Sequence, residues 1–174
     1  HRAYTAVVSG LASVLALTSG GVATAVTGLP TDHGRYMSIA MNHATGKVYA
    51  ANYAAGASGG LAFPGFVAVI DSATGTVPKV ITVGDQPLGI GIDETRNRIY
   101  VANYGLSGTP GTISVIDGST DTVLTTVTSP SSSVRFVRDL APNTATNKVY
   151  VRSATSTSPL WVLNGATFAL SAVT

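Results

Sequence analysis

The chain of 174 residues contains no cysteine, and only 10% of its residues are charged. The lack of cysteine excludes a disulfide framework, thiolate ligands for a metal and a thiol nucleophile. Ten Lys and Arg against eight Asp and Glu give a net charge of +2, and the basic residues are scattered singly. A nucleic-acid binder needs a concentrated basic surface, so nucleic acid is not an expected partner. With 45% hydrophobic residues, a packed body of one-domain length is expected instead.

The sequence also lacks an apolar run of the roughly 20 residues that a transmembrane segment needs. The longest largely apolar run, residues 6–17, follows Arg2 and precedes Ala23-Thr24-Ala25, the small-residue pattern of a signal-peptidase site. We therefore predict that residues 1–25 are a signal peptide and that the protein is extracytoplasmic, whether secreted, periplasmic or on the cell surface. The alternative is that residues 22–27 form a strand of the folded body.

Two motifs recur three times beyond residue 30. The first centres on Tyr49, Tyr100 and Tyr150, and the second ends at Asp71, Asp117 and Asn164. Each copy also has a short apolar segment before the first motif, and the first two copies have a β-prone segment after the second. Four strands per repeat, named a to d in chain order, are therefore predicted: a at 38–42, 89–93 and 139–143; b and c at the two motifs; d at 80–83, 123–127 and from 169. The three tyrosines are expected in the core of the repeats.

The connections carry turn residues in the places where hairpins need them. Each a-to-b segment opens with Asn or Asp and has Gly46, Asn97 or Asn147 in fifth place, where a left-handed backbone is tolerated. The c-to-d segments open with Asp71, Asp117 and Asn164. No stretch beyond residue 30 has a convincing helical period, so the body is predicted to be all-β with antiparallel hairpins.

Four antiparallel strands repeated every 45 to 50 residues or so are typical of β-propeller blades. The second copy, Tyr100-Val101-Ala102-Asn103 followed by Ser114-Val115-Ile116-Asp117, resembles the YVTN repeat. The first copy departs with Tyr49-Ala50-Ala51-Asn52, and the third departs further with Tyr150-Val151-Arg152-Ser153. The resemblance covers residues 35–174 and implies an exported or cell-surface propeller.

The repeats occupy a predicted body of residues 26–174, with blades near 35–83, 86–127 and 136–174. Propellers have typically 4 to 8 blades, so about three blades make an incomplete ring, and the last blade is truncated. Open sheet edges and uncovered blade faces are then expected to favour self-association.

Several segments match part of a catalytic, cofactor-binding or metal-binding motif but lack the sequence context that the motif requires. Residues 56–60 match the pattern G-x-S-x-G but lie in a b-to-c loop, without the following helix that a nucleophile elbow needs. Gly89 and Gly91 lack the rest of a dinucleotide fingerprint and are interpreted as packing glycines. Asp117 and Asp121 are too few oxygen ligands for calcium and are interpreted as turn-capping residues. We expect no catalytic residue, no metal ligand and no cofactor.

The remaining candidates lie at the mouth of the channel, because the loops that enter strand a and leave strand b share one rim. The candidate ligand-binding residues are His33, Arg35, Asp85, Arg138 and Asp139. Only the third copy places a charged pair, Arg138 and Asp139, where the other copies have Met37-Ser38 and Leu88-Gly89. The alternative is that Arg138 and Asp139 pair with each other or with solvent.

Two functions remain open. The first is an exported, non-catalytic binding or cell-surface scaffold module that recognises a protein, a glycan or a cell-wall polymer. The second is a lactonase-like propeller enzyme with an axial metal or carboxylate site, which missing blades would have to complete. For this second function the rim offers only Asp32, His33, Asp85 and Asp139.

The signal-like pattern predicts that residues 1–30, fused to a reporter in a bacterium, carry it out of the cytoplasm with cleavage near Ala25. N-terminal sequencing of the exported reporter checks the cleavage site. Intact reporter found only in the cytoplasm would contradict the prediction.

Overall fold

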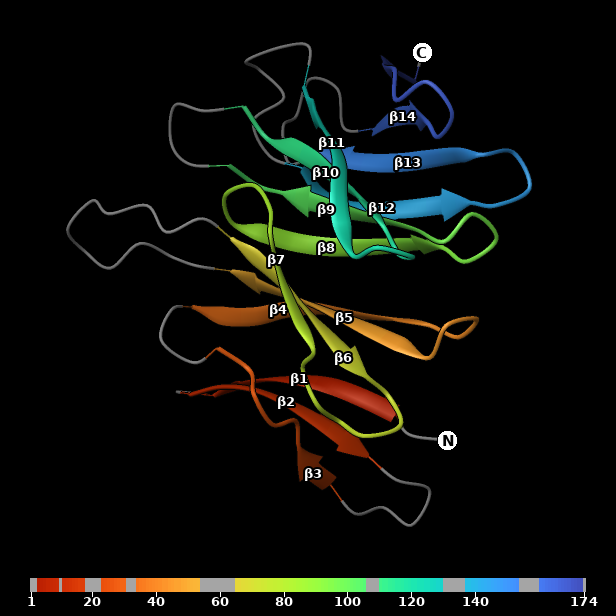
Figure 1. Cartoon of the computed structure of the whole chain (residues 1–174). Helices are drawn as coiled ribbons and strands as arrows, with labels where there is room; N and C mark the ends of the chain where they lie inside the picture. Colours follow the sequence, from red (N-terminus) through yellow and green to blue (C-terminus); the bar gives the residue numbers. More distant parts are fainter. Residues whose placement is uncertain are drawn as a thin grey trace, which may run out of the picture.

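The computed structural model describes residues 3–9, 11–17, 23–30, 34–53, 65–105, 110–129, 137–153 and 160–173 (Figure 1). All regular structure in these ranges is β-strand. Among the described residues there is accordingly no helix with the length and apolar character to span a bilayer. The strands are β1 (Ala3–Ser9), β2 (Leu11–Leu17), β3 (Ala23–Ala25), β4 (Arg35–Asn42), β5 (Lys47–Tyr53), β6 (Phe66–Asp71), β7 (Lys79–Thr82), β8 (Pro87–Asp93), β9 (Arg98–Asn103), β10 (Thr112–Asp117), β11 (Thr122–Thr128), β12 (Val137–Asn143), β13 (Lys148–Ser153), β14 (Leu160–Asn164) and β15 (Leu170–Ala172).

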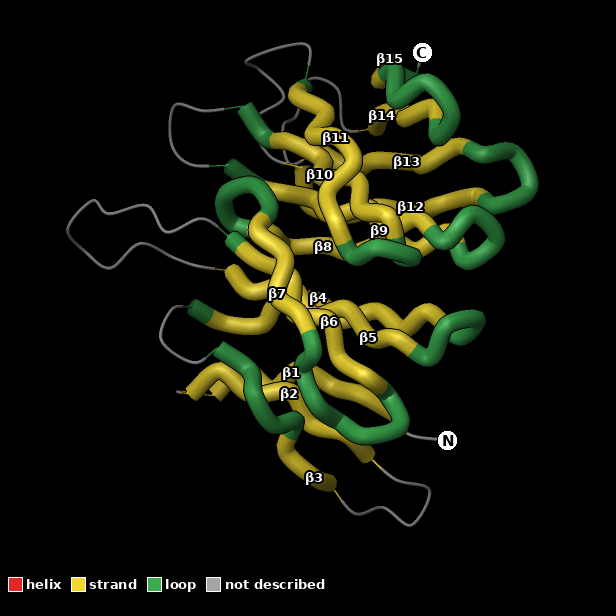
Figure 2. The backbone as a smooth tube through the Cα atoms, viewed as in Figure 1, coloured by secondary structure: helices red, strands yellow, loops and turns green. Residues whose placement is uncertain are grey.

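Three four-stranded antiparallel sheets follow one another along the chain. Their strand orders are β4-β5-β6-β7, β8-β9-β10-β11 and β12-β13-β14-β15, and we call them blade 1, blade 2 and blade 3. The innermost strand of blade 2, β8, lies beside both β4 and β12. The sheets stack in an open arc, with β1–β3 at one end and blade 3 at the other (Figures 1 and 2). The prediction of an all-β propeller with about three blades in an incomplete ring is therefore confirmed.

The hairpin turns have the backbone that the sequence predicts. Gly46, Asn97 and Asn147 have φ values of 69°, 49° and 52° in the a-to-b turns. The fifth residues of the c-to-d turns, which include Gly75 and Asp121 at 75° and 52°, are also left-handed. Glycine, asparagine and aspartate tolerate this region better than other residues, so these five turns reverse the chain with little strain; the third c-to-d turn differs, because it has Phe168 at this position with a φ of 57°.

The apolar cores lie between the blades. Tyr49 and Val69 of blade 1 pack with Ile99 and Ile116 of blade 2, and an equivalent cluster around Tyr100 joins blades 2 and 3. Because blades 1 and 2 are covered on both faces, successive residues from Val48 to Asn52 are all buried. In a strand covered on one face only, burial alternates, as it does along β13.

The core prediction holds for two of the three repeat tyrosines and is wrong for the third. Tyr49 and Tyr100 are fully buried, whereas Tyr150 is exposed. The reason is the direction of the side chain: this tyrosine always faces the next blade, and no described residue packs against that face of blade 3.

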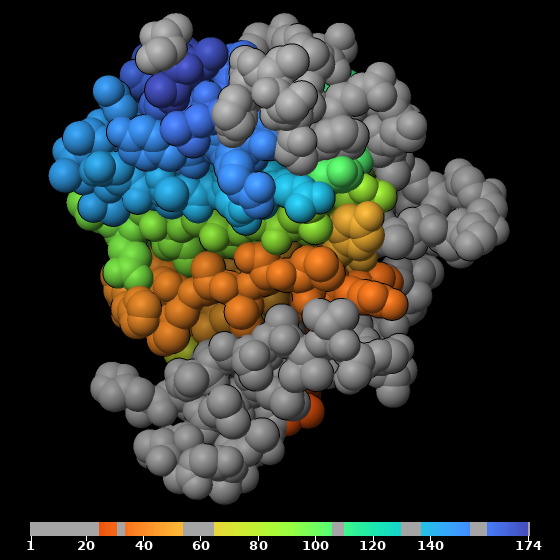
Figure 3. Space-filling model, turned by 180° about the vertical axis from the view of Figure 1, so that it is seen from behind, coloured from red at the N-terminus to blue at the C-terminus, as the bar shows by residue number. Residues whose placement is uncertain are grey.

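The innermost strands approach one another closely because blade 2 has glycines there. A Cβ on Gly89 would meet the carbonyl oxygen of Arg138, and one on Gly91 would meet the ring of Pro142. Both glycines are therefore packing glycines, as predicted. Seen from behind, the orange, green and blue blades succeed one another as continuous bands (Figure 3).

The N-terminal residues add a further sheet to the stack. Strands β1, β2 and β3 pair in an antiparallel sheet, and β1 and β2 lie beside β4. Val26 and Leu29 then pack against the outer face of blade 1, and Thr27 forms a bridge to Thr76. The alternative prediction, a strand within residues 22–27, corresponds to β3. The signal peptide and its cleavage stay predictions.

Burial raises the pKa of Tyr49 and Tyr100 above that of an exposed tyrosine, with nearby Asp121 and Asp93 adding to the effect. Ionising either hydroxyl is therefore less favourable in the fold than in the unfolded chain, so the two groups leave the free energy of unfolding unchanged below about pH 10 and lower it as the pH rises towards their folded-state pKa values. We predict a steep fall in the free energy of unfolding above about pH 10 in urea titrations. Tyr49→Phe should make this fall of the unfolding free energy with pH less steep. An unchanged slope in the variant would show that ionisation of Tyr49 does not cause the fall.

Candidate functional site

The rim of the channel mouth is built on one backbone feature that recurs in every blade. The innermost strands β4, β8 and β12 each contain a bulge near their first residue, at Met37, Leu88 and Arg138. A β-bulge leaves one residue out of the ladder and redirects its side chain. The alignment of Arg138 with Met37 and Leu88 is therefore correct, and the same backbone position carries three different side chains.

Backbone hydrogen bonds hold the rim segment of blade 2 in place. The amides of Tyr104 and Gly105 donate to the carbonyl oxygens of Gln86 and Asp85 at 3.0 and 3.1 Å. Gln86 has a φ of 54°, a left-handed turn position just before β8. The segment that enters β8 is thus tied to the segment that leaves β9.

Arg138 joins blade 3 to blade 2 at this rim. Its guanidinium carbon lies 5.5 Å from the centre of the Tyr104 ring, which is a cation–π contact, and its side chain is exposed. Such a contact contributes about 0.5–1 kcal/mol at an exposed position. Since the guanidinium forms no hydrogen bond or ion pair with a described residue, its donors can serve a ligand.

Asp139 pairs with a residue that the sequence interpretation did not select. Both Nε and Nη2 of Arg152 donate to Asp139 Oδ2, with Nε at 2.7 Å. The two residues face each other across β12 and β13. The alternative in which Arg138 pairs with Asp139 is therefore wrong, because Arg138 contacts Tyr104 instead. Counting antiparallel register from the turn at 144–147 would have placed Arg152 opposite Asp139.

The other candidates are not brought into contact with one another. Arg35 is exposed at the first position of β4, and Asp85 is partly buried before β8. No hydrogen bond or ion pair between these two is found in the described part of the chain. His33 lies outside the described residues. The structure thus places Arg35, Asp85, Arg138 and Asp139 at one rim and leaves His33 a prediction.

A buried amide below the rim differs between blades 1 and 2. Asn103 Nδ2 donates to Thr112 Oγ1 and Ser114 Oγ at 3.0 and 2.9 Å. Its counterpart Asn52 is fully buried, and none of its amide atoms has a hydrogen-bond partner among the described residues. The cause is local, because Asn52 faces the apolar Phe66 across the ladder where Asn103 faces Thr112.

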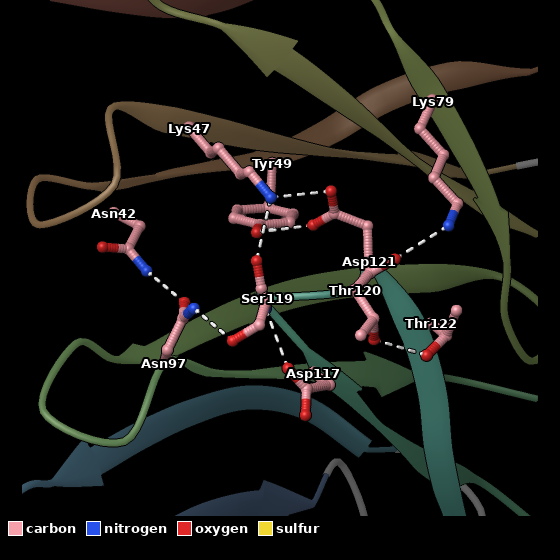
Figure 4. Close-up of polar contacts among 11 residues, drawn as sticks. Asn42, Lys47, Tyr49, Lys79, Asn97, Asp117, Ser119, Thr120, Asp121 and Thr122 are labelled. Carbon is pink, nitrogen blue, oxygen red and sulfur yellow. Dashed lines mark hydrogen bonds and ion pairs between the residues drawn. The ribbon is translucent and has the colours of Figure 1, made fainter.

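The opposite end of the blades carries a denser polar cluster (Figure 4). Lys47 Nζ donates to Asp121 Oδ2 and to the Gly118 carbonyl at 2.7 and 2.8 Å, and Tyr49 Oη donates to Asp121 Oδ1 at 3.1 Å. Lys47 and Tyr49 of blade 1 thereby hold the c-to-d turn of blade 2. We call this set of three contacts the blade latch.

Other polar groups in this cluster are also paired within the protein. Asn42 Nδ2 donates to Asn97 Oδ1 at 2.9 Å. The Ser119 amide and Arg98 both donate to Asp117, and these bonds, the amide first, lower the pKa of the Asp117 carboxyl. Asp117 and Asp121 therefore act as turn residues, as predicted. No group of three or more His, Asp or Glu side chains among the described residues could share a metal ion.

The blade latch is missing between blades 2 and 3. Phe168 occupies the turn position of Asp121, with a φ of 57°, and the buried Tyr100 hydroxyl has no partner among the described residues. Arg98, the counterpart of Lys47, donates to Asp117 of its own blade. Blades 2 and 3 are held by their apolar cluster, to which Phe168 contributes, and at this end by a bond from Arg96 Nη1 to the Thr144 carbonyl oxygen at 2.8 Å.

No protein-family model matches the chain. No curated protein sequence matches it either.

Solved structures resemble it at low identity. The Dos1 propeller matches with a TM-score of 0.72 at 12% identity, covering 97% of this chain and 44% of that one. Sqt1 of Saccharomyces cerevisiae matches with a TM-score of 0.66 at 13% identity, covering 92% of this chain and 41% of Sqt1. Hydrazine synthase of Kuenenia stuttgartiensis matches with a TM-score of 0.64 at 15% identity, covering 84% of this chain and 37% of the synthase chain. The chain therefore spans less than half the length of these proteins, and the likeness shows the β-propeller fold.

The blade latch predicts that Asp121→Gly lowers the free energy of unfolding by about 1–3 kcal/mol, because Lys47 and Tyr49 lose their acceptor. Glycine suits the left-handed backbone and is the natural residue at the equivalent Gly75, so backbone strain does not explain a loss. Urea denaturation measures the change.

Tyr49→Phe and Tyr100→Phe form a matched pair of controls. Tyr49→Phe should destabilise, whereas Tyr100→Phe should cost little, since the Tyr100 hydroxyl has no partner to lose. Equal losses from the two variants would show that the latch contributes nothing specific.

Proposed function

We propose that this protein is an exported, non-catalytic β-propeller module that binds a partner at the rim of its channel mouth. The observation that supports the proposal most directly is the recurring bulge. A repeated backbone feature that presents Met37, Leu88 and Arg138 in turn is a scaffold on which side chains vary without cost to the fold.

The charge of the rim favours a partner that carries carboxylate or phosphate groups. Arg35 and Arg138 are exposed there without an ion pair to a described residue. Arg152 is neutralised by Asp139, and the partly buried Asp85 is the one further acid among the residues described there. Guanidinium groups bind carboxylates and phosphates through paired hydrogen bonds. An acidic protein segment or an anionic cell-wall polymer both present such groups along a chain.

The proposal of export and surface location rests on the signal-like residues 1–25 and on the resemblance to the YVTN repeat. Membership of that family is part of the proposal, carried by Tyr100-Val101-Ala102-Asn103 and its two less regular copies. The lactonase-like alternative has no supporting observation among the described residues, where Asp139 is paired with Arg152.

Binding of fluorescent poly-glutamate and of poly(glycerol phosphate), followed by anisotropy, tests the proposal. Arg138→Ala should weaken binding by about 1–3 kcal/mol, the scale of a lost charged hydrogen bond, with less than about 1 kcal/mol of lost stability. Lys79→Ala is the matched control, because it removes one positive charge from an outer strand and should leave the affinity unchanged.

The two probes separate the two kinds of partner, because only one of them carries phosphate. A lower melting temperature with unchanged affinity in Arg138→Ala would reject the site and leave Arg138 a structural contact between blades 2 and 3.

A further inference from the structure

Blade 3 exposes an apolar face that its sister blades bury. Tyr150, Leu160 and Val173 are 38%, 40% and 49% exposed. Register along the repeats makes their counterparts in blade 1 Tyr49, Val67 and Ile81, which are 0%, 0% and 5% exposed. The same three positions are therefore buried in the core in blade 1 and exposed on the surface in blade 3.

The face of blade 1 shows what covers these positions. Tyr49, Val67 and Ile81 belong to one cluster with Ile99 and Ile116 of blade 2. At the turn end of the same face, Lys47 and Tyr49 hold Asp121 of blade 2 through the blade latch. The occupant of this face is thus a second four-stranded blade with an acidic side chain at its c-to-d turn.

Blade 3 carries the holding half of the same latch. Lys148 and Tyr150 occupy the positions of Lys47 and Tyr49, each facing its partner strand in the same register, and both are exposed. Arg152, on the same face, replaces the small side chains Ala51 and Ala102 of the other copies. The face is therefore apolar at its centre, with the Lys148 cation at one end of β13 and the ion pair of Arg152 with Asp139 at the other.

We infer that the exposed face of blade 3 binds a further blade of the same repeat type, one whose c-to-d turn carries aspartate at the position of Asp121. The acid is the discriminating feature. Blade 3 itself has Phe168 there, and it sits on blade 2 without a latch while Arg98 is engaged elsewhere. A blade of the blade 2 type satisfies Lys148 and Tyr150, and one of the blade 3 type does not.

A covalent extension of the chain provides the test. Residues 83–128, which comprise blade 2 and its incoming connection, are fused directly after residue 174. One version keeps the aspartate that corresponds to Asp121, and the other has phenylalanine in its place, as in blade 3. Each version is also made with Tyr150→Phe, which completes a double-mutant cycle.

The aspartate version should melt about 2–4 °C higher than the phenylalanine version, and Tyr150→Phe should remove most of that difference. Tyr100→Phe is the control and should leave the difference intact, because Tyr100 faces blade 3. Nitration by tetranitromethane, read by mass spectrometry, gives a second measurement: Tyr150 should react in the original chain and be protected in the fusion.

Three results would overturn the inference. One is continued nitration of Tyr150 in both fusions, which would mean that no blade docks there. Another is protection of Tyr150 with equal melting temperatures for the aspartate and phenylalanine versions. The third is a dimer of the original chain that Tyr150→Lys dissociates and the fusion does not prevent, which would assign the face to a second copy.

Discussion

Face-to-face packing of the blades is the constraint on which the rest of the structure depends. Val48 and Tyr49 are adjacent in the chain and point to opposite faces of β5, yet both are fully buried. Among the described residues no helix covers a blade, so the sheets bury their apolar faces against one another, except for the outer face of blade 1, where Val26 and Leu29 help to cover Val48. The glycines of β8, which admit β12, and the exposure of Tyr150 are both consequences of this arrangement.

The two ends of the blades use their polar residues differently. At the turn end, lysine, tyrosine and asparagine side chains of one blade bond to the next, so little of their hydrogen-bonding capacity remains for a ligand. At the rim, Arg35 and Arg138 are exposed and form no ion pair with a described residue. This difference, more than the number of charges, favours the rim as the surface for recognition.

The strands and turns could be predicted from the sequence because each depends on residues close together in the chain. Asn97 and Asn147 in fifth place of their turns, and the recurring tyrosine motif, were sufficient. Copy-to-copy alignment also placed Arg138 correctly on the rim. The contact of Arg138 with Tyr104 could not be read this way, because it needs the position of a neighbouring blade; that of Asp139 with Arg152 needs cross-strand register counted from the turn at 144–147. Tyr150 was misjudged for the same reason, since its burial depends on what covers its blade.

Observation of the arginine side chains during binding tests the central claim that the rim is the recognition surface. In protein labelled with nitrogen-15 at arginine, addition of poly-glutamate or poly(glycerol phosphate) should shift the Nε–H signals of Arg35 and Arg138. The signals of Arg96 and Arg98, which donate to Asp93 and Asp117 at the turn end, should stay in place. Shifts confined to Arg96 and Arg98, or no shift of any arginine signal, would contradict the account.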